Sequence, residues 1–309
     1  MKNPWRPGSH PRWPAETRKE RVIDMAEVIR SIPALQEWSM NAKKQGRKVG
    51  LVPTMGFLHA GHLSLIDTAR ENGADVIAVS IFVNPTQFGP NEDFDRYPRD
   101  FEHDRALCES KGVDVIFAPG VNDMYAGDLT CWVQEEKISK GLCGITRPIH
   151  FRGVATVVAK LFNAALPDIA VFGQKDAQQA AVIKRMVRDL NFPVRVVVSP
   201  IVREDSGLAM SSRNKYLSED EKKRALSISQ SLFAAKAALE SGASADVKAV
   251  RDEIAAKIAA AGGRVDYVEV LDAETMLPRE SEDVRRITIA VAAYFGTTRL
   301  IDNIRIDLK

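Results

Sequence analysis

The sequence predicts an α/β fold: a doubly wound parallel sheet followed by a smaller C-terminal α+β domain. Short apolar, β-branched segments alternate with segments of helical length up to about residue 200. Beyond that point two alanine-rich segments precede three further β-branched runs, so the alternation stops. Strands that alternate with helices require crossover connections, and these build a parallel sheet that is covered on both faces. A chain of 309 residues also exceeds one average domain, which favours two.

The first 200 residues supply the strands and helices of the parallel sheet. Residues 1–20 contain four prolines and little apolar periodicity, so we expect a flexible N-terminal extension there. Helical spacing from Ile29 to Trp38 predicts that order begins near Met25. We assign residues 21–200 to this domain. The expected strands are 49–53, 76–83, 113–118, 169–172 and 194–199, and the expected helices are 63–70, 100–111, 154–166 and 177–190.

The C-terminal part, residues 201–309, is expected to form a small α+β lid domain. Its alanine-rich segments at 219–240 and 246–261 predict two helices. Three apolar runs near 264–271, 286–293 and 299–306 predict consecutive strands.

Composition excludes several classes of protein. The 43 basic and 41 acidic side chains leave a net charge of +2, which argues against partners such as nucleic acid or an anionic membrane. No apolar run approaches the roughly 18 residues of a membrane span. Cys108, Cys131 and Cys143 form no C-x-x-C pair, so we expect neither a structural metal nor a disulfide. These features predict a cytoplasmic protein.

The first candidate motif joins an expected strand to an expected helix. Residues 53–62 read Pro-Thr-Met-Gly-Phe-Leu-His-Ala-Gly-His. Such a junction lies at the carboxyl edge of a parallel sheet, where ligands bind. The helix N-terminus offers free N–H groups and a positive dipole end for phosphate. His59 and His62 are three residues apart, so both imidazoles can face one side of the first helical turn. There they can stabilise the negative charge that develops on a phosphate during displacement. Alone, such a histidine pair is more often structural or metal-binding.

The second motif, residues 209–213, reads Ala-Met-Ser-Ser-Arg and lies near the expected domain junction. Adjacent hydroxyl groups and a guanidinium can hold the outer phosphates of a nucleotide. A polar surface loop is the alternative interpretation.

The third motif, residues 173–179, reads Gly-Gln-Lys-Asp-Ala-Gln-Gln and again leaves a strand for a helix. Gly173 permits close approach to a ribose, and Lys175 offers a charge for phosphate. Asp176 is open to two interpretations, a helix cap and a ribose contact.

The fourth motif, residues 82–89, ends the strongest predicted strand. Asn84 and Gln87 place neutral amides at the same sheet edge. An Asn-Pro turn explains Asn84 without function, but a turn does not need Gln87. Neutral amides suit a hydroxy acid whose carboxylate must remain nucleophilic.

In order and spacing these motifs resemble those of the pantothenate synthetase family, within the H-x-G-H nucleotidyltransferase superfamily. Residues 96–100, 150–158 and 266–270 add further matches, and the resemblance spans about residues 22–306. It implies a Rossmann-like ATP-binding domain and an ATP-dependent ligase. Such an enzyme condenses pantoate with β-alanine through a pantoyl adenylate, releasing AMP and diphosphate. It further implies that Mg²⁺ accompanies ATP, that no protein metal cage is needed, and that the chain forms a homodimer.

The resemblance also implies residue roles, each carried onto the matching position. His59 and His62 would stabilise the adenylation transition state, together with Lys175 and Arg213. The ATP site would be formed by Met55, His62, Gly173, Lys175, Asp176, Val202, Met210, Ser211, Ser212 and Arg213. Pantoate would be held by Gln87 and Gln179, with Asn84 and Tyr97 nearby.

The chain departs from the family pattern at a few positions. The family usually has an acidic residue at Gln174, an aromatic at Ala177, glycine at Ile149 and alanine at Phe57. We expect Ala177 to loosen the packing beside Lys175 and Phe57 to narrow the pocket next to His59. These departures predict altered kinetic constants rather than a different reaction.

Three rival interpretations remain at this point. Cytidylyltransferases and NMN adenylyltransferases share H-x-G-H, but are not expected to carry Gln87 and Gln179 at this spacing. An RNA-binding protein on a synthetase-like fold would need a basic stripe interleaved with aromatic residues, which the sequence lacks. A catalytically dead scaffold would not need His59 and His62.

Overall fold

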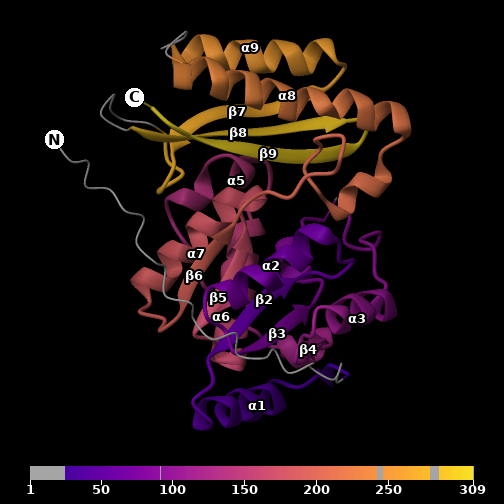
Figure 1. Cartoon of the computed structure of the whole chain (residues 1–309), viewed down its shortest axis with the longest axis vertical. Coiled ribbons are helices and arrows are strands. Elements are labelled where there is room, and N and C mark those ends of the chain that lie inside the picture. Colours follow the sequence, from indigo (N-terminus) through magenta and orange to yellow (C-terminus); the bar gives the residue numbers. More distant parts are fainter. Residues whose placement is uncertain (1–24, 91, 242–245, 279–284, 309) are drawn as a thin grey trace, which may run out of the picture.

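The computed structural model describes residues 25–308 except residue 91 and the segments 242–245 and 279–284. The extension expected at residues 1–20 lies outside these described residues. Within the described part the chain forms a larger unit around a parallel sheet and a smaller unit around an antiparallel sheet (Figure 1).

The larger unit is built on a six-stranded sheet in which every paired strand is parallel. The strands lie in the order β1-β4-β3-β2-β5-β6. Their bounds are β1 Glu27–Ile29, β2 Val49–Thr54, β3 Val76–Ile81, β4 Val115–Phe117, β5 Ile169–Gly173 and β6 Arg195–Ser199. The chain builds outward from β2 in one direction through β3 and β4, then returns to add β5 and β6 on the other side. The switch point therefore lies between β2 and β5, and the loops after these strands diverge at the carboxyl edge.

Helices cover both faces of this sheet, as the nearly continuous burial of its central strands requires. On one face Leu51 packs in a core with residues of α1 (Ile32–Lys44), α6 (His150–Ala165) and α7 (Ala177–Asp189). On the other face Val52 packs in a core that includes residues of α2 and α3. Helix α2 spans Ala60–Glu71 and α3 spans Phe101–Ser110, while α4 (Val121–Met124) and α5 (Cys143–Thr146) are single turns.

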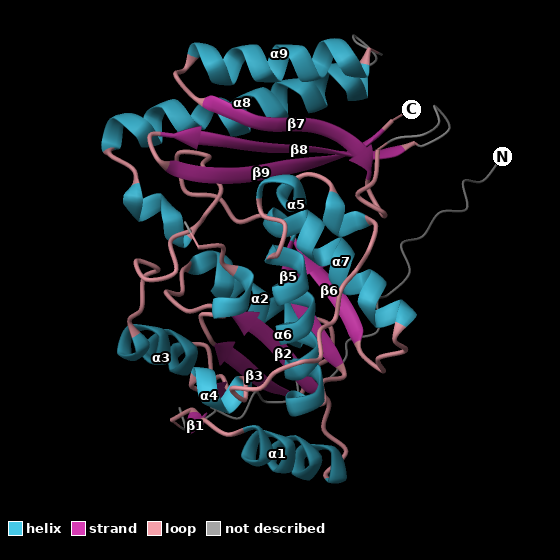
Figure 2. Ribbon diagram, turned by 180° about the vertical axis from the view of Figure 1, so that it is seen from behind, coloured by secondary structure: helices cyan, strands magenta, loops and turns pink. Residues whose placement is uncertain are grey.

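The smaller unit places two helices on one face of a three-stranded antiparallel sheet (Figure 2). Its elements are α8 Glu219–Ser241, α9 Val247–Ala260, β7 Arg264–Asp272, β8 Arg286–Phe295 and β9 Thr298–Asp307. A separate apolar core lies between the helices and the sheet. Leu271, Met276 and Ala290 instead join the core that contains α6 and α7, so the other face of this sheet packs on the larger unit.

The predicted fold class is confirmed, with errors in several elements; α2, for example, begins at Ala60, three residues before the expected start at Leu63. The helical spacing from Ile29 was misleading, because Glu27–Ile29 is a strand and α1 begins only at Ile32, after the Ser31 cap. A three-residue strand has no periodicity of its own, and pairing with β4 determines its conformation. Helix α6 also begins at His150, four residues before the expected start at Val154. The division at residue 200 stays a prediction.

In the part of the chain that the structure describes, no helix is both long enough and apolar enough to cross a membrane.

Candidate active site

Two adjoining cavities lie at the carboxyl edge of the parallel sheet, where the larger unit meets the smaller one. The inner cavity measures about 190 Å³ and the outer one about 530 Å³. They share lining residues, among them Gln87, Lys175 and Arg213, so they form one continuous site. Every site residue predicted from the sequence lines the inner cavity: Met55, His59, His62, Asn84, Gln87, Tyr97, Gly173, Lys175, Asp176, Gln179, Val202, Met210, Ser211, Ser212 and Arg213.

The turn after β2 is held in an unusual backbone conformation. Gly56 and Phe57 both have positive φ, 83° and 49°. The Asp104 carboxylate of α3 stabilises this turn by accepting hydrogen bonds from the backbone N–H groups of Phe57 (2.8 Å) and Leu58 (2.6 Å). A side chain at Gly56 would approach Oδ2 of Asp104 to 2.9 Å, so glycine is required there. This turn places His59 at the N-cap position of α2.

His59 and His62 form a reciprocal cap at the N-terminus of α2. Nδ1 of His59 accepts from the Gly61 N–H (3.1 Å), and Nδ1 of His62 accepts from the His59 N–H (3.3 Å). Each ring therefore carries its proton on Nε2. The ring centroids lie 4.0 Å apart, and both residues line the inner cavity.

Both imidazoles are neutral at physiological pH. Burial, and then the charge of Lys175, lower the pKa of His59 to about 4. Burial, followed by the neighbouring His59 and Lys175, lowers the pKa of His62 well below its usual value. Neutral rings with a protonated Nε2 are hydrogen-bond donors without net charge. Such donors can stabilise negative charge that develops on a substrate only during the reaction.

Phe57 does not narrow the pocket as expected. It is absent from the residues that line either cavity. Its positive φ directs the ring to the outside of the turn, where the Lys215 ammonium lies 4.1 Å from the ring centroid and His103 packs beside it. Phenylalanine in place of the family's alanine therefore changes this outer contact, not the space beside His59.

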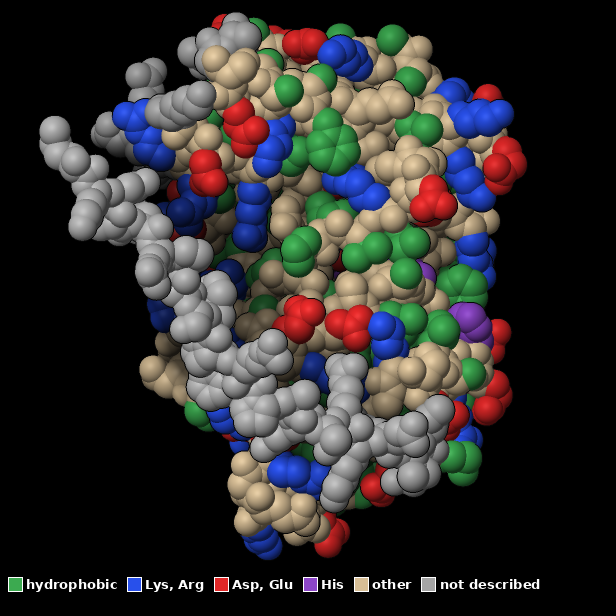
Figure 3. Space-filling view, in the orientation of Figure 1, with side chains coloured by type: hydrophobic (Ala, Val, Ile, Leu, Met, Phe, Trp, Pro, Cys, Tyr) green, Lys and Arg blue, Asp and Glu red, His purple; other side chains and the backbone are tan. Residues whose placement is uncertain are grey.

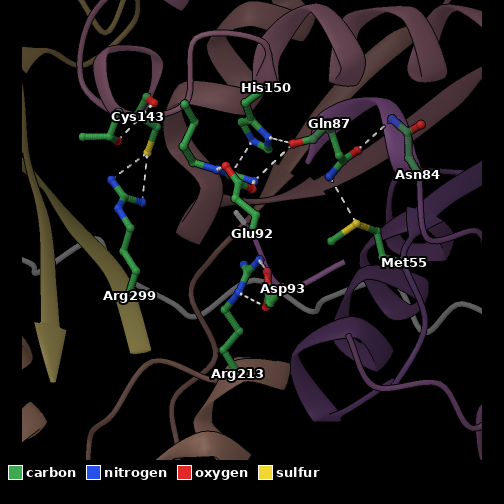
Figure 4. A network of polar contacts seen from close by, with 11 residues as sticks. Met55, Asn84, Gln87, Glu92, Asp93, Cys143, His150, Arg213 and Arg299 are labelled. Atoms are coloured by element: carbon green, nitrogen blue, oxygen red, sulfur yellow. Dashed lines mark hydrogen bonds and ion pairs between the residues drawn. The ribbon is translucent and has the colours of Figure 1, made fainter. Parts of the chain in front are cut away.

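Asn84 and Gln87 form an ordered amide pair at the end of β3 (Figure 4). Nδ2 of Asn84 donates to Oε1 of Gln87 (3.0 Å) and to the Gly153 carbonyl (3.2 Å). Its Oδ1 accepts from Tyr125 (2.8 Å) and from Thr86, so the orientation of the Asn84 amide is fixed. Asn84 also caps the 3₁₀ turn Pro85–Gln87, as the turn interpretation expected. The turn interpretation of Asn84 is therefore confirmed, and its role toward a substrate stays a prediction.

Lys175 lies on a 3₁₀ turn, Gln174–Asp176, between β5 and α7. Its Nζ is 3.6 Å from Oδ2 of Asp176. Asp176 occupies the N-cap position of α7 but makes no side-chain capping bond, so the helix-cap interpretation is wrong. Ala177 is buried and lines the outer cavity, so an aromatic side chain there would take up part of that space.

Arg213 lines the same cavity as the two histidines and is held by Asp93. Nε and Nη2 of Arg213 donate to the two carboxylate oxygens of Asp93 (2.9 and 2.8 Å). Burial opposes both charges, but the pair overcomes it: the pKa of Asp93 is lowered and that of Arg213 is raised. Ser212 donates to the Phe57 carbonyl (3.2 Å), which ties this loop to the β2–α2 turn. Arg213 is therefore a cation of fixed orientation that lines the same cavity as the N-terminus of α2.

Several residues that support the site escaped the sequence reasoning. Arg147 donates to Glu92 (2.9 Å) and to the Gln87 carbonyl (3.2 Å), and His150 lies 3.0 Å from the same carbonyl. Burial, followed by the charge of Arg147, lowers the pKa of His150 to about 3. His150 stood inside a segment that matches the family, and this match was the available signal. Asp93, Glu92 and Arg147 carried no separate signal.

The outer wall of the site comes from the smaller unit. Arg299 of β9 donates to Asp266 (3.0 and 2.7 Å), and its guanidinium lies 3.4 Å from the sulfur of Cys143. Figure 4 shows Arg299 and Cys143 together on one side of the view, with Gln87 on the other. The described residues contain no group of three or more His, Cys, Asp or Glu side chains placed to hold a metal ion. All three cysteines are free.

The space-filling view shows how side chains of different kinds gather on one face of the molecule (Figure 3). Lys and Arg side chains are scattered among acidic ones there rather than gathered into one basic stripe. This mixed surface agrees with the near-neutral net charge of the sequence and gives no support to the RNA-binding interpretation.

The arrangement can bind a polyanion and stabilise new negative charge. One cavity is lined by a helix N-terminus with two neutral imidazoles, by a lysine and an arginine, and by an oriented neutral amide. Together with the doubly wound sheet, this site defines an enzyme of the H-x-G-H nucleotidyltransferase type.

Comparisons with known proteins narrow this class to one family. The family model described as pantoate-beta-alanine ligase matches residues 27–305. Pantothenate synthetase of Thermoanaerobacter sp. is 54% identical over 290 residues, covering 92% of this chain and 97% of the relative. That of Sulfurihydrogenibium sp. is 52% identical over 280 residues, covering 90% and 99%. The chain belongs to the pantoate–β-alanine ligase family.

Solved structures agree with this assignment. Pantothenate synthetase from Thermus thermophilus superposes with a TM-score of 0.83 at 42% identity, covering 90% of this chain and 98% of that one. Pantoate-beta-alanine ligase from Francisella tularensis was solved in complex with β-γ ATP and β-alanine. It superposes with a TM-score of 0.75 at 34% identity, covering 90% of this chain and 97% of that one.

Proposed function

We propose that this enzyme condenses (R)-pantoate with β-alanine to form pantothenate in an ATP-dependent reaction that passes through an enzyme-bound pantoyl adenylate. The observation that carries the proposal is the inner cavity, which brings together two neutral imidazoles, two cationic side chains and an oriented amide. The Francisella ligase, which was solved with β-γ ATP and β-alanine, supports the choice of substrates.

In the first step a pantoate carboxylate oxygen attacks the α-phosphorus of ATP, and the bond to the diphosphate breaks. Negative charge then gathers on the oxygens of the α-phosphate, in reach of Nε2–H donors from His59 and His62. Lys175 and Arg213 hold the outer phosphates and offset the charge of the leaving diphosphate. No residue forms a covalent bond to substrate, so the catalysis is positioning and electrostatics.

The substrates divide the inner cavity between them. Gln87 and Gln179 hold pantoate through neutral amides, with Asn84 and Tyr97 nearby, which leaves the carboxylate nucleophilic. The nucleotide is held by the other predicted site residues, which line the same cavity: Met55, Gly173, Asp176, Val202, Met210, Ser211 and Ser212.

Mg²⁺ would accompany ATP, and its charge would offset that of the phosphates. Asp176 is the one acidic side chain among the described residues that line the inner cavity, and Mg²⁺ commonly binds through phosphate oxygens and few carboxylates. This donor set fits a metal bound chiefly to the nucleotide, with Asp176 in reach as a protein oxygen.

In the second step the β-alanine amine attacks the carbonyl carbon of the adenylate. The C–N bond forms, the bond to AMP breaks, and the amine loses a proton. The outer cavity adjoins Gln87 and provides the route by which β-alanine reaches the adenylate. We further propose a homodimer in the cytoplasm, on the family resemblance alone; light scattering measures the oligomeric state.

The test measures AMP release from ATP and Mg²⁺ with pantoate and β-alanine, omitting each acid in turn. We expect AMP to require both acids, and ATP–diphosphate exchange to require pantoate alone. Exchange without β-alanine supports the adenylate, because the first step then reverses on its own. AMP formation that depends on a different acceptor would favour another nucleotidyltransferase. No AMP or exchange from folded, ATP-binding protein would contradict the proposal.

A further inference from the structure

Two adjacent residues of β9, Asp302 and Asn303, contact the turn that carries Lys175 and the segment that leads to Arg213. Both side chains are buried, at 4% and 3% exposed, and both residues line the outer cavity. They pair with Val291 and Ala290 of β8, in the middle of the antiparallel sheet. Their position within the smaller unit is therefore fixed by strand pairing on one side.

Asn303 binds the turn that carries Lys175. Its Nδ2 donates to the backbone carbonyls of Gln174 (2.8 Å) and Lys175 (3.0 Å). Its Oδ1 accepts from Nε2 of Gln174 (3.3 Å). One side-chain amide of β9 thus makes three hydrogen bonds to two consecutive residues of this turn. These bonds fix the backbone from which the Lys175 side chain extends into the site.

Asp302 binds the segment that leads to Ser211 and Arg213. Its carboxylate accepts from Nη1 (2.6 Å) and Nη2 (3.0 Å) of Arg203. Arg203 pairs with Ala209 in an isolated antiparallel bridge and donates to the Gly207 carbonyl (3.2 Å). The 203–209 turn is therefore anchored through Arg203, and its last residues continue directly into the 211–213 loop.

We propose that Asp302 and Asn303 form a β9 clasp that positions Lys175 and Arg213 relative to each other for binding the ATP phosphates. The proposal rests on the proposed function of these two cations as phosphate ligands. Lys175 lies on the turn after β5, whereas Arg213 lies on the 3₁₀ turn Ser212–Tyr216 before α8. These two segments are distant in sequence. The clasp joins both loops to one rigid strand, so docking of the smaller unit sets the spacing of the cations. Asp302 and Asn303 act as positioning residues.

Gln174 gives the clasp a feature particular to this chain. The resemblance implies an acidic side chain at this position, which cannot donate a hydrogen bond to Oδ1 of Asn303 when ionised. Glutamine supplies that donor while Nδ2 of Asn303 stays on the two carbonyls. The departure at Gln174 thus adds a third hydrogen bond to the clasp.

The experiment compares Asn303→Asp with wild type and with Ile304→Val. The aspartate keeps the shape of Asn303 but loses both donors to the turn. Ile304 is the next residue on β9; it packs in the separate core of the smaller unit, so its variant controls for loss of stability. The readouts are the KM for each substrate, the unfolding temperature, and amide hydrogen exchange of the segment 173–180.

We expect Asn303→Asp to raise the KM for ATP about tenfold and to speed hydrogen exchange in 173–180. The KM for pantoate should change less than about threefold, and Ile304→Val should leave every KM unchanged. Asp302→Asn should raise the KM for ATP as well, with faster exchange in 203–213. If Asn303→Asp does not fold, Gln174→Leu removes only the third bond and should give a smaller change in the same direction.

Unchanged ATP kinetics together with unchanged exchange in 173–180 would overturn the clasp, as would equal rises of every KM in step with lower stability. The proposed function is tested separately, by wild type alone. If wild type lacks pantoate-dependent exchange, that function fails, and the clasp is then judged by equilibrium binding of MgATP and by hydrogen exchange. Equal ATP affinity in Asn303→Asp and wild type would still contradict it.

Discussion

The side-chain nitrogen of Asn84 donates a hydrogen bond to Oε1 of Gln87 across 3.0 Å. This bond decides which end of the Gln87 amide faces the cavity. Nε2 of Gln87 is left with the sulfur of Met55 at 3.1 Å, a weak acceptor that a carboxylate or hydroxyl oxygen can replace. The site thus presents an oriented N–H donor where pantoate is proposed to bind.

The first prediction changes this orientation. Asn84→Asp places a carboxylate against Oε1 of Gln87, so the amide turns over and directs its oxygen into the cavity. We expect the KM for pantoate to rise about tenfold or more while the KM for ATP changes little. Tyr125→Phe is the matched control, because Oδ1 of Asn84 keeps its bonds from Thr86. A rise in the KM for ATP of the same size would contradict the assigned role.

The second prediction concerns the helix cap. His59→Gln removes one Nε2–H donor from the position where charge develops during adenylation. We expect the rate of pantoate-dependent ATP–diphosphate exchange to fall by about 10²–10³, with little change in the KM for pantoate. His103→Gln is the control, since His103 lies on α3 and lines neither cavity. A loss below about threefold for His59→Gln would show that the imidazole is structural.

The third prediction follows from the lowered pKa values of the buried histidines. The pKa of His59 is about 4 and that of His150 about 3, against 6.5 in the unfolded chain. As the pH falls below about 6.5, the unfolded chain binds protons at these sites and the folded protein does not. The free energy of unfolding therefore decreases as the pH falls from 6.5 toward 4.

Urea unfolding at several pH values measures this slope. His150→Gln removes one of the contributing groups, so we expect a shallower slope than in wild type between about pH 6.5 and 5. Equal slopes in the two proteins would mean that His150 is protonated in the folded state.

The doubly wound sheet could be predicted from the sequence because its strands are β-branched and both faces are buried. Val76–Ile81 is buried at five of its six positions, and such a run differs clearly from an amphipathic helix. Glu27–Ile29 could not be predicted in this way, because three residues are too few for a pattern. Its conformation depends on β4, which lies far along the chain.

The candidate site likewise has residues that could be predicted from the sequence and residues that could not. His59 and Lys175 stand at strand-to-helix junctions, and the topology of a parallel sheet brings such junctions to one edge. The partners that hold the site are different. Asp93 and Arg213 are 120 residues apart, and Gln174 and Asn303 are 129 apart. A single polar contact between distant segments leaves no periodic pattern, so only the folded chain reveals it.

The fourth prediction contrasts two glycines that border the site. A side chain at Gly153, in the first turn of α6, would press on the carbonyl of Thr86 and lie 2.7 Å from Cα of Gln87. Gly153→Ala must therefore displace the turn that carries Gln87. We expect a loss of about 1–3 kcal/mol in the free energy of unfolding and a higher KM for pantoate.

Gly173 is the matched case without a clash. Its φ of −79° suits alanine, and no atom lies within 4 Å of an added Cβ. Gly173→Ala should keep or slightly raise the unfolding temperature, because alanine restricts the unfolded chain. If Gly173 admits the ribose, as proposed, the new methyl group occupies that space and the KM for ATP rises with stability intact. Thermal unfolding and ATP kinetics on both variants check the pair; normal ATP kinetics in Gly173→Ala would place the ribose elsewhere in the cavity.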